Sequence, residues 1–351
     1  MINLYILYFY KLSYNDKKRL FIEQFNKSEL INLHFLDISK YTTLELENLI
    51  NKGTFFILDF DRVFKLKHIF YVFDRYYSNK FFLRLDHDRL HVKTCAKNNI
   101  KGLIFYIHKV LKNPSSLIDF VYRRLFKSKI NFTYFTSGVL KGKGVRVPSF
   151  TFEQSKAFIK DKDMKLYHLF LDQNLPFHRD AKISFKTKID KNLYYNYLNN
   201  FFDQLEAKTG KKVIIALHPR TEHSKYSFKG RESYINKTAE LVSKADIIMG
   251  HYSTSIHYPI IFNKKLLLLS DPQMKLCERL VHIQGFSEIL NIPIIDLSNF
   301  DINNIDKHIN INNYVKYMHE YIIDNNINKD KPIYRFIIEE IYRLSKQNDL
   351  P

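Results

Sequence analysis

The segment KKVIIALHPRTEHSKYSFKGR, residues 211–231, contains the most apolar strand that the sequence predicts and a sharp stop at its end. Residues 213–217 are all apolar, which is typical of a parallel strand buried on both faces. His218, Pro219 and Arg220 follow directly, and a proline cannot donate the hydrogen bond that would continue a sheet. The segment therefore predicts a buried strand that ends in a polar loop.

A second strand stops in the same way further along the chain, within ADIIMGHYSTSIHYPIIF at residues 245–262. Gly250 gives the backbone freedom to turn, and Ser253, Thr254 and Ser255 then precede an apolar run of helical character. Serine and threonine cap helices, and the N–H groups of a first helical turn attract anions. One hydroxyl suffices for capping, so three in succession predict an anion-binding site that requires no metal ion.

Apolar runs of strand length alternate with longer amphipathic stretches along the chain, and helices are predicted at residues 190–208 and 231–244. This alternation is typical of βαβ units, which build parallel sheets with helices on their faces. The predicted strands are residues 2–9, 32–36, 54–59, 80–85, 102–107, 131–135, 166–171, 213–217, 246–249, 265–269 and 293–296.

The length and composition favour two packed domains. The chain has 351 residues, 45% of them hydrophobic, with only 9 glycines and 9 prolines, so two cores of roughly 150–180 residues each are expected. Turn-forming and basic residues concentrate between Gly138 and Asp163, which predicts the seam. We therefore expect an N-terminal α/β domain at residues 1–150 and a second α/β domain at 151–330. An amphipathic helix at 331–351 is expected to pack back on the N-terminal domain.

The formal net charge of +19 favours anionic partners: nucleic acids, phosphorylated metabolites or an anionic membrane surface. The lysines are scattered, and the sequence contains no zinc finger, basic arm or RNA-binding aromatic motif, so we expect no nucleic acid partner. Residues 1–12 are apolar but shorter than the roughly 20 residues of a membrane span, and we interpret them as a core strand. Two cysteines, Cys95 and Cys277, predict neither a disulfide framework nor a zinc site and fit a reducing cytoplasm.

Both strand ends suit a phosphate-binding site, because ligands of open α/β sheets bind at the carboxyl ends of strands. The imidazole of His218 and the planar guanidinium of Arg220 can both donate hydrogen bonds to phosphate oxygens. Arg231 precedes a predicted helix and could reach a nucleotide or a sugar. For each of these side chains the alternative is a solvated basic residue in a loop, and the pattern alone leaves that alternative open.

The His-Pro-Arg turn, together with TAELVSKADIIMGHYSTSIHYPIIFNKKLLLL at residues 238–269, resembles the donor-binding half of GT-B glycosyltransferases that build bacterial surface polysaccharides. It is similar to the sialyltransferase-like, Kdo-transferase-like and polyol-phosphate-transferase families, which carry a His-Pro motif and a later pair of serines. FLDQNLPFH at 170–178 resembles the opening of this half in capsule and O-antigen proteins. The resemblance covers about residues 165–270. It implies a GT-B fold, in which two Rossmann-like α/β domains face a cleft.

The resemblance implies that His218, Ser253 and Ser255 bind the phosphate of a nucleotide-activated donor. The polyol-phosphate transferases have an aspartate where this chain has His251, which replaces an acid by a potential cation and argues against that branch. We add Arg220 and Thr254 to the predicted site on chemical grounds. Pro219, Arg231 and His251 complete the set of residues predicted to bind the donor phosphate or nucleotide.

Glycosyl transfer also requires a base that takes the proton of the acceptor hydroxyl, and the resemblance places this base in the N-terminal domain. The candidates are Asp59, Asp86 and Asp88, which lie at predicted strand ends in FFILDFDRVF and FLRLDHDRLHV. Both segments also contain Asp-x-Asp, the pattern with which GT-A enzymes bind a metal and a nucleotide sugar. Because the phosphate-binding features lie in the other half of the chain, we expect no metal and no other cofactor.

These features predict a metal-independent glycosyltransferase that inverts the anomeric carbon. The donor expected first is a CMP-activated acidic sugar, sialic-acid-like or Kdo, because paired hydroxyls suit a single phosphate; UDP- and GDP-sugars stay open. The expected acceptor is a glycan or lipid-linked glycan of the bacterial surface. The expected location is the cytoplasm, with peripheral contact at the anionic inner face of the membrane. The alternatives are a CDP-polyol phosphotransferase of the same fold, a basic non-catalytic protein that binds glycan or nucleic acid, and an inactive GT-B scaffold.

Overall fold

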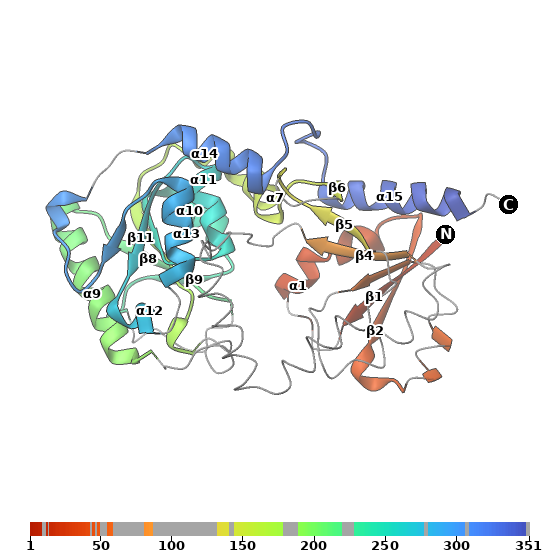
Figure 1. Ribbon diagram of the computed structural model, residues 1–351, viewed down its shortest axis with the longest axis horizontal. Helices are drawn as coiled ribbons and strands as arrows, with labels where there is room; N and C mark the ends of the chain where they lie inside the picture. The colour runs from red at the N-terminus through yellow and green to blue at the C-terminus, as the bar shows by residue number, and fades with distance from the viewer. Residues whose placement is uncertain are drawn as a thin grey trace, which may run out of the picture.

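The computed structural model describes residues 1–8, 12, 14–42, 44–45, 48–49, 55–58, 81–86, 132–139, 144–177, 189–219, 228–276, 280–305 and 309–348. These residues form two lobes, each built around a sheet with helices beside it (Figure 1). Within the described ranges each sheet has six strands, and all of their pairings are parallel. The prediction of two α/β domains with parallel sheets is confirmed.

The N-terminal sheet has the strand order β2-β1-β3-β4-β5-β6. The order reverses between β1 and β3, because β2 lies on one side of β1 and all later strands lie on the other. Helices α1 (Tyr14–Arg19) and α2 (Ile22–Asn26) follow β1 in the chain. The strands are β1 (Ile2–Tyr8), β2 (Ile31–Asp37), β3 (Phe55–Leu58), β4 (Phe81–Asp86), β5 (Phe132–Thr136) and β6 (Val145–Arg146).

The C-terminal sheet has the order β12-β11-β10-β7-β8-β9, which reverses between β7 and β10. Its strands are β7 (Tyr167–Leu171), β8 (Val213–Leu217), β9 (Ser233–Ile235), β10 (Ala245–Gly250), β11 (Lys265–Ser270) and β12 (Ile294–Asp296). The described helices of this lobe are α7 (Phe150–Ser155), α9 (Lys191–Thr209), α10 (Thr238–Lys244), α11 (His257–Ile261), α12 (Pro272–Leu276), α13 (Leu280–Leu290) and α14 (Ile311–Tyr317). In the described part of the chain, no helix is both long enough and apolar enough to cross a bilayer.

Local sequence signals set the bounds of the helices, as α9 illustrates. The carboxylate of Asp190 accepts a hydrogen bond from the backbone N–H of Leu193 at 2.9 Å and so caps the first turn. Gly210 ends the helix with a φ of 70°, a left-handed conformation that glycine adopts without strain. Between these ends, buried residues recur every three to four positions from Tyr194 to Leu205, so one face of α9 packs against the sheet.

The helix predicted at residues 231–244 is wrong in its first half. Residues 233–235 form β9, which pairs in parallel with residues 215–217 of β8, and α10 begins only at Thr238. Asn236 adopts a φ of 61° and ends the strand before the helix starts. The predicted strand at residues 102–107 lies outside the described residues.

The C-terminal helix α15 (Ile333–Asn348) returns to the N-terminal lobe, beside which it lies in Figure 1. Its buried residues Ile333, Ile337, Ile341 and Leu344 belong to the same hydrophobic core as the first strands of the chain. Their spacing of three to four residues places them on one face of the helix. The first strand and the last described helix therefore share one hydrophobic core.

The chain crosses between the lobes through a closely fitted contact. The π-helical turn Met318–Ile322 lies against the loop that follows β5. The hydroxyl of Ser137 donates to the carbonyl of Tyr321 at 2.8 Å, and the N–H of Val139 donates to the carbonyl of His319 at 3.1 Å. Gly138 lies between these two residues with a φ of 63°, where a Cβ atom would meet the carbonyl oxygen of Glu320 at 2.2 Å. Only glycine fits this position without moving the backbone.

Candidate active site

A cavity of about 710 Å³ lies between the two lobes at the carboxyl edge of the C-terminal sheet. Its walls are formed by the ends of β7 and β8, the turn after β10, the start of α10, helix α7 and, across from them, α1 of the N-terminal lobe. The strand order of the C-terminal sheet reverses beside this cavity, and such reversal points are where open α/β sheets bind ligands. The volume falls in the range of small-molecule sites, about 300–1,000 Å³.

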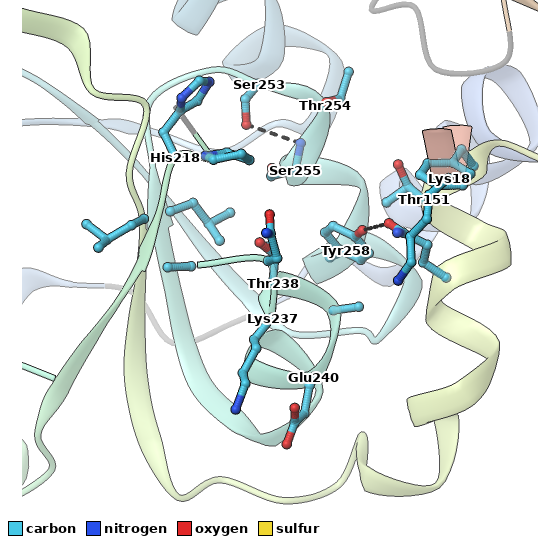
Figure 2. Close-up of a pocket in the computed structure, with 18 of the residues that line it drawn as sticks. Lys18, Thr151, His218, Lys237, Thr238, Glu240, Ser253, Thr254, Ser255 and Tyr258 are labelled. Carbon is cyan, nitrogen blue, oxygen red and sulfur yellow. Dashed lines mark hydrogen bonds between the residues drawn. The ribbon is translucent and has the colours of Figure 1, made fainter. Parts of the chain in front are cut away.

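The structure brings His218, Pro219, Ser253, Thr254 and Ser255 together at this cavity. They follow two strands, β8 and β10, that lie on either side of β7. Figure 2 shows the imidazole of His218 close to the three hydroxyl-bearing residues, at one end of the hollow. Parallel strands bring their carboxyl ends to one edge of a sheet, which explains why two polar stops far apart in the sequence share one site.

A buried carboxylate positions His218. Asp172, which directly follows β7, is 7% exposed. One of its oxygens accepts the N–H of Asn174 at 2.8 Å, and the other accepts the backbone N–H of His218 at 3.4 Å. The carboxylate therefore ties the two strand ends to each other, while the His218 side chain faces the cavity.

The three hydroxyl-bearing residues have different roles: Ser253 caps a helix, and Thr254 and Ser255 lie in its first turn. Ser253 Oγ accepts a hydrogen bond from the N–H of Ser255 at 3.1 Å and caps the short 3₁₀-helix η6 (Thr254–Ile256). This turn continues directly into α11, so residues 254–261 form one helical run that starts at the cavity. The hydroxyls of Thr254 and Ser255 lie in the first turn of this run, beside the Ser253 cap (Figure 2).

The opposite wall contains residues that the sequence reasoning did not select. Asp16, Lys18 and Arg19 of α1 line the cavity, and Lys18 lies across it from His218 in Figure 2, next to Thr151 of α7. Cationic side chains therefore face the cavity from the N-terminal lobe. A signal for this wall was present in the sequence, since NDKKR follows the first predicted strand at its carboxyl end, where ligands of parallel sheets bind.

The floor of the cavity is the start of α10, which the sequence reasoning had placed inside a longer helix. Thr238 is its first residue and lies below Ser255 in Figure 2. Glu240 also lines the cavity, but its carboxylate is engaged by the ammonium of Lys244 at 2.9 Å. Lys237 lies with its ammonium 5.4 Å from the centre of the Tyr234 ring.

His251, which the sequence predicts to bind the nucleotide-activated donor, lies in the core and is not among the residues that line the cavity. It is 1% exposed, and its Nδ1 donates to the carbonyl of Leu269 at 2.7 Å. Because a carbonyl only accepts, Nδ1 carries a proton, and in the neutral imidazole Nε2 then accepts a hydrogen bond from the Tyr194 hydroxyl at 2.9 Å. His251 therefore holds β10 to β11 and to α9, a structural role that the prediction missed.

Arg231 also differs from the prediction, because its guanidinium turns away from the cavity. It forms ion pairs with Asp203 at 2.6 Å and with Glu206 at 2.7 Å, both on α9. Burial lowers the pKa of Arg231, but the hydrogen bonds and charges of Glu206 and Asp203 outweigh burial and raise this pKa overall. The side chain links α9 to the segment before β9.

The remaining predicted residues stay predictions. Arg220, Asp59 and Asp88 lie outside the described residues. Asp86 is the last residue of β4, in register with Thr136 of β5, and its side chain lies outside the described part of the structure. The described part of the chain also contains no group of three or more histidine, cysteine, aspartate or glutamate side chains arranged to hold a metal ion.

The sequence matches no family model and no curated protein, whereas the fold matches solved structures over nearly the whole chain. MurG from Acinetobacter baumannii superimposes with a TM-score of 0.52 at 7% identity, covering 98% of this chain and 100% of MurG. A variant of the wall teichoic acid polymerase TagF, soaked with CDPG, superimposes with a TM-score of 0.51 at 10% identity, covering 99% of this chain and 90% of the polymerase.

The fold is GT-B. The two six-stranded parallel sheets and the cavity between their lobes agree with the fold that the sequence resemblance implied. At such low sequence identity the similarity shows the fold alone. An argument about chemistry must therefore rest on the residues that line the 710 Å³ cavity between the lobes, called the GT-B cavity below.

Proposed function

We propose that the protein is a metal-independent glycosyltransferase that uses a nucleotide-activated donor to extend a cell-surface glycan. The observation that supports this proposal is the joint position of His218 and residues 253–255 at the strand-reversal edge of the C-terminal sheet. These groups face a second lobe that supplies Lys18 and Arg19 across the cavity. The arrangement surrounds a volume suited to a small molecule with hydrogen-bond donors and positive charge.

In the proposed reaction the donor phosphate lies between His218 and the hydroxyls of Thr254 and Ser255. The bond between the anomeric carbon and the phosphate oxygen breaks, and the oxygen keeps the electron pair. Hydrogen bonds from the imidazole and the hydroxyls stabilise this developing charge, as oxyanion-hole donors do. The acceptor oxygen attacks from the opposite side, which inverts the anomeric carbon.

The donor that we propose first is CMP linked to an acidic sugar, sialic-acid-like or Kdo. Two hydroxyls beside one imidazole suit a single phosphate group. Lys18 and Arg19 on the facing wall would then pair with the carboxylate of the sugar. The proposed acceptor is a glycan or lipid-linked glycan, and the net charge of +19 favours peripheral contact with an anionic membrane leaflet.

A CDP-polyol phosphotransferase is the second candidate, because TagF, with the same fold, was studied with CDPG. In that branch the sequence resemblance calls for an aspartate at the position of His251. His251 is buried between Tyr194 and Leu269, so it cannot replace that acid in the cavity. The first proposal therefore has more support from the site.

The test combines nucleotide binding with two cavity variants. Thermal unfolding is measured with CMP, CDP, UDP and GDP, and a nucleotide at 100 times its Kd stabilises the protein by about 2.7 kcal/mol. His218→Ala and Ser255→Ala should each lower turnover by about 100-fold, the typical loss for one oxyanion donor. Unchanged turnover in both variants contradicts the assignment. Binding that depends steeply on salt, with no preference for nucleotides, would instead support a non-catalytic binding protein.

A further inference from the structure

The loop that follows β7 joins the two strand ends that carry His218 and the hydroxyl-bearing residues 253–255. β7 lies between β8 and β10 in the C-terminal sheet, and Asp172 and Gln173 follow it directly. Asp172 accepts the backbone N–H of His218, which follows β8, at 3.4 Å. Gln173 Oε1 accepts the backbone N–H of Tyr252, which lies just beyond β10, at 2.9 Å. The loop therefore fixes His218 relative to the turn of residues 252–255.

The hydrogen bond from Tyr252 also fixes the orientation of the Gln173 carboxamide. A backbone N–H can only donate, so the oxygen of the carboxamide faces Tyr252 and its NH₂ group faces elsewhere. Gln173 lines the GT-B cavity and is partly exposed. Within the described part of the chain, the amide nitrogen donates to no protein acceptor and is not one of the fully buried polar atoms that lack a partner. Two N–H donors are therefore open to a ligand in the cavity.

The phosphate is the group of the proposed donor that suits these N–H groups. Ionised phosphate oxygens accept hydrogen bonds, and bonds to a charged acceptor are stronger than bonds between neutral groups. The proposed position of the phosphate is between His218 and the hydroxyls of Thr254 and Ser255. These residues follow β8 and β10, and Gln173 follows the strand that lies between the two. Asp172 adds a buried negative charge nearby, but both of its oxygens already accept backbone N–H groups.

We propose that Gln173 is a further ligand of the donor phosphate, an inference that rests on the proposed function. The side chain has two tasks: Oε1 holds the turn of residues 252–255, and Nε2 donates a hydrogen bond to a phosphate oxygen. The amide stays neutral and transfers no proton. Its hydrogen bond strengthens as negative charge develops on the departing phosphate, so it stabilises the transition state more than the bound donor.

The experiment compares Gln173→Glu with Gln154→Glu in the full-length protein. A glutamate at position 173 keeps an oxygen for the N–H of Tyr252, but it has no N–H donor and adds a negative charge. Gln154 of α7 lines the same cavity, and its Oε1 likewise accepts a hydrogen bond, from the Tyr258 hydroxyl at 2.5 Å. Gln154→Glu therefore adds the same charge to a different wall of the cavity and keeps the oxygen that Tyr258 contacts.

Calorimetry of wild type with CMP, UMP and GMP identifies the monophosphate that binds most tightly, and this ligand is compared with its own nucleoside in both variants. Gln173→Glu should weaken binding of the monophosphate by about 10- to 150-fold, the equivalent of one hydrogen bond to a charged group, and leave nucleoside binding within about twofold of wild type. Gln154→Glu should change the affinity for the monophosphate by less than about threefold, because a charge further from the phosphate is screened.

Two results overturn the assignment of Gln173 alone: an equal loss of monophosphate binding in both variants, or an equal loss of monophosphate and nucleoside binding in Gln173→Glu. The second result would place Gln173 at the base or give it a purely structural role. If none of the three monophosphates binds wild type more tightly than its nucleoside, the phosphate site itself is refuted, and the proposed function falls with it.

A second measurement on the wild-type protein does not depend on the stability of the glutamate variant. In protein labelled with ¹⁵N at glutamine side chains, the NH₂ resonance of Gln173 is identified by its absence in Gln173→Met. Its proton signal should move downfield when the monophosphate is added and stay in place with the nucleoside, since a hydrogen bond to an anion deshields the donated proton. An unchanged signal at saturating monophosphate contradicts the proposal.

Discussion

The contact between Gly138 and the π-helical turn at residues 318–322 allows a stability prediction with a built-in control. In Gly138→Ala the new Cβ would lie 2.2 Å from the carbonyl oxygen of Glu320, so the turn must move away. The left-handed backbone costs roughly 1–2 kcal/mol for any non-glycine residue. Movement of the turn also weakens two hydrogen bonds, Ser137 to Tyr321 and Val139 to His319, each worth about 1 kcal/mol. The expected total is about 3–4 kcal/mol.

Gly210→Ala is the matched control, because Gly210 has a similar φ of 70° but no atom within 4 Å of the Cβ position. This variant should lose only the left-handed term, roughly 1–2 kcal/mol. The free energies of unfolding of both variants are measured by urea titration with circular dichroism. Gly138→Ala should lose at least about 2 kcal/mol more than Gly210→Ala. Equal losses would show that the turn does not press on the loop after β5, and the reasoning about this crossing would fail.

Three further predictions follow from other sites. Burial lowers the pKa of Lys264 from 10.5 to about 8, so between these pH values the unfolded chain binds more protons than the folded protein, and the contribution of Lys264 to stability rises with pH. The free energies of unfolding of wild type and Lys264→Met, measured by urea titration at pH 8 and at pH 10, should therefore differ by an amount that changes with pH. A difference that is the same at both pH values contradicts the assignment. Tyr194→Phe removes the hydrogen bond between the Tyr194 hydroxyl and His251 Nε2 and should lower the free energy of unfolding by about 1–3 kcal/mol. Tyr197→Phe on the same helix should lower it by under about 0.5 kcal/mol, and similar losses in both urea titrations would refute the buried hydrogen bond. EDTA should leave transfer unchanged in a steady-state assay, and a requirement for Mg²⁺ would contradict the metal-independent mechanism.

The central strands could be predicted from sequence because strands of a parallel sheet are buried on both faces. Residues 213–217 and 265–270 are nearly continuous apolar runs, so burial pattern and sequence pattern agree. The edge strand at 233–235 could not be predicted, since its three residues take strand conformation only through pairing with β8, a partner that local patterns do not reveal. Short edge strands therefore marked the limit of the sequence reasoning.

The residues of the candidate site also differ in whether local sequence patterns could predict them. His218 and Ser253 could be selected because each ends a readable strand, and the parallel topology brings those ends together. His251 has the same sequence signal, yet its environment is decided by Tyr194, 57 positions earlier in the chain. Asp16 belongs to the other lobe, and only the arrangement of the two lobes places it at the cavity. Contacts between distant segments are what the sequence pattern could not supply.

The most direct test of the central claim compares CMP with cytidine in calorimetric titrations of wild type and His218→Ala. The two ligands differ only by the phosphate, so their comparison isolates the contribution of the phosphate site. Loss of one hydrogen bond to a charged group, about 1.5–3 kcal/mol, should weaken CMP binding by at least about tenfold and leave cytidine binding unchanged. Equal CMP affinity in wild type and His218→Ala would contradict the claim that this edge of the C-terminal sheet binds the donor phosphate.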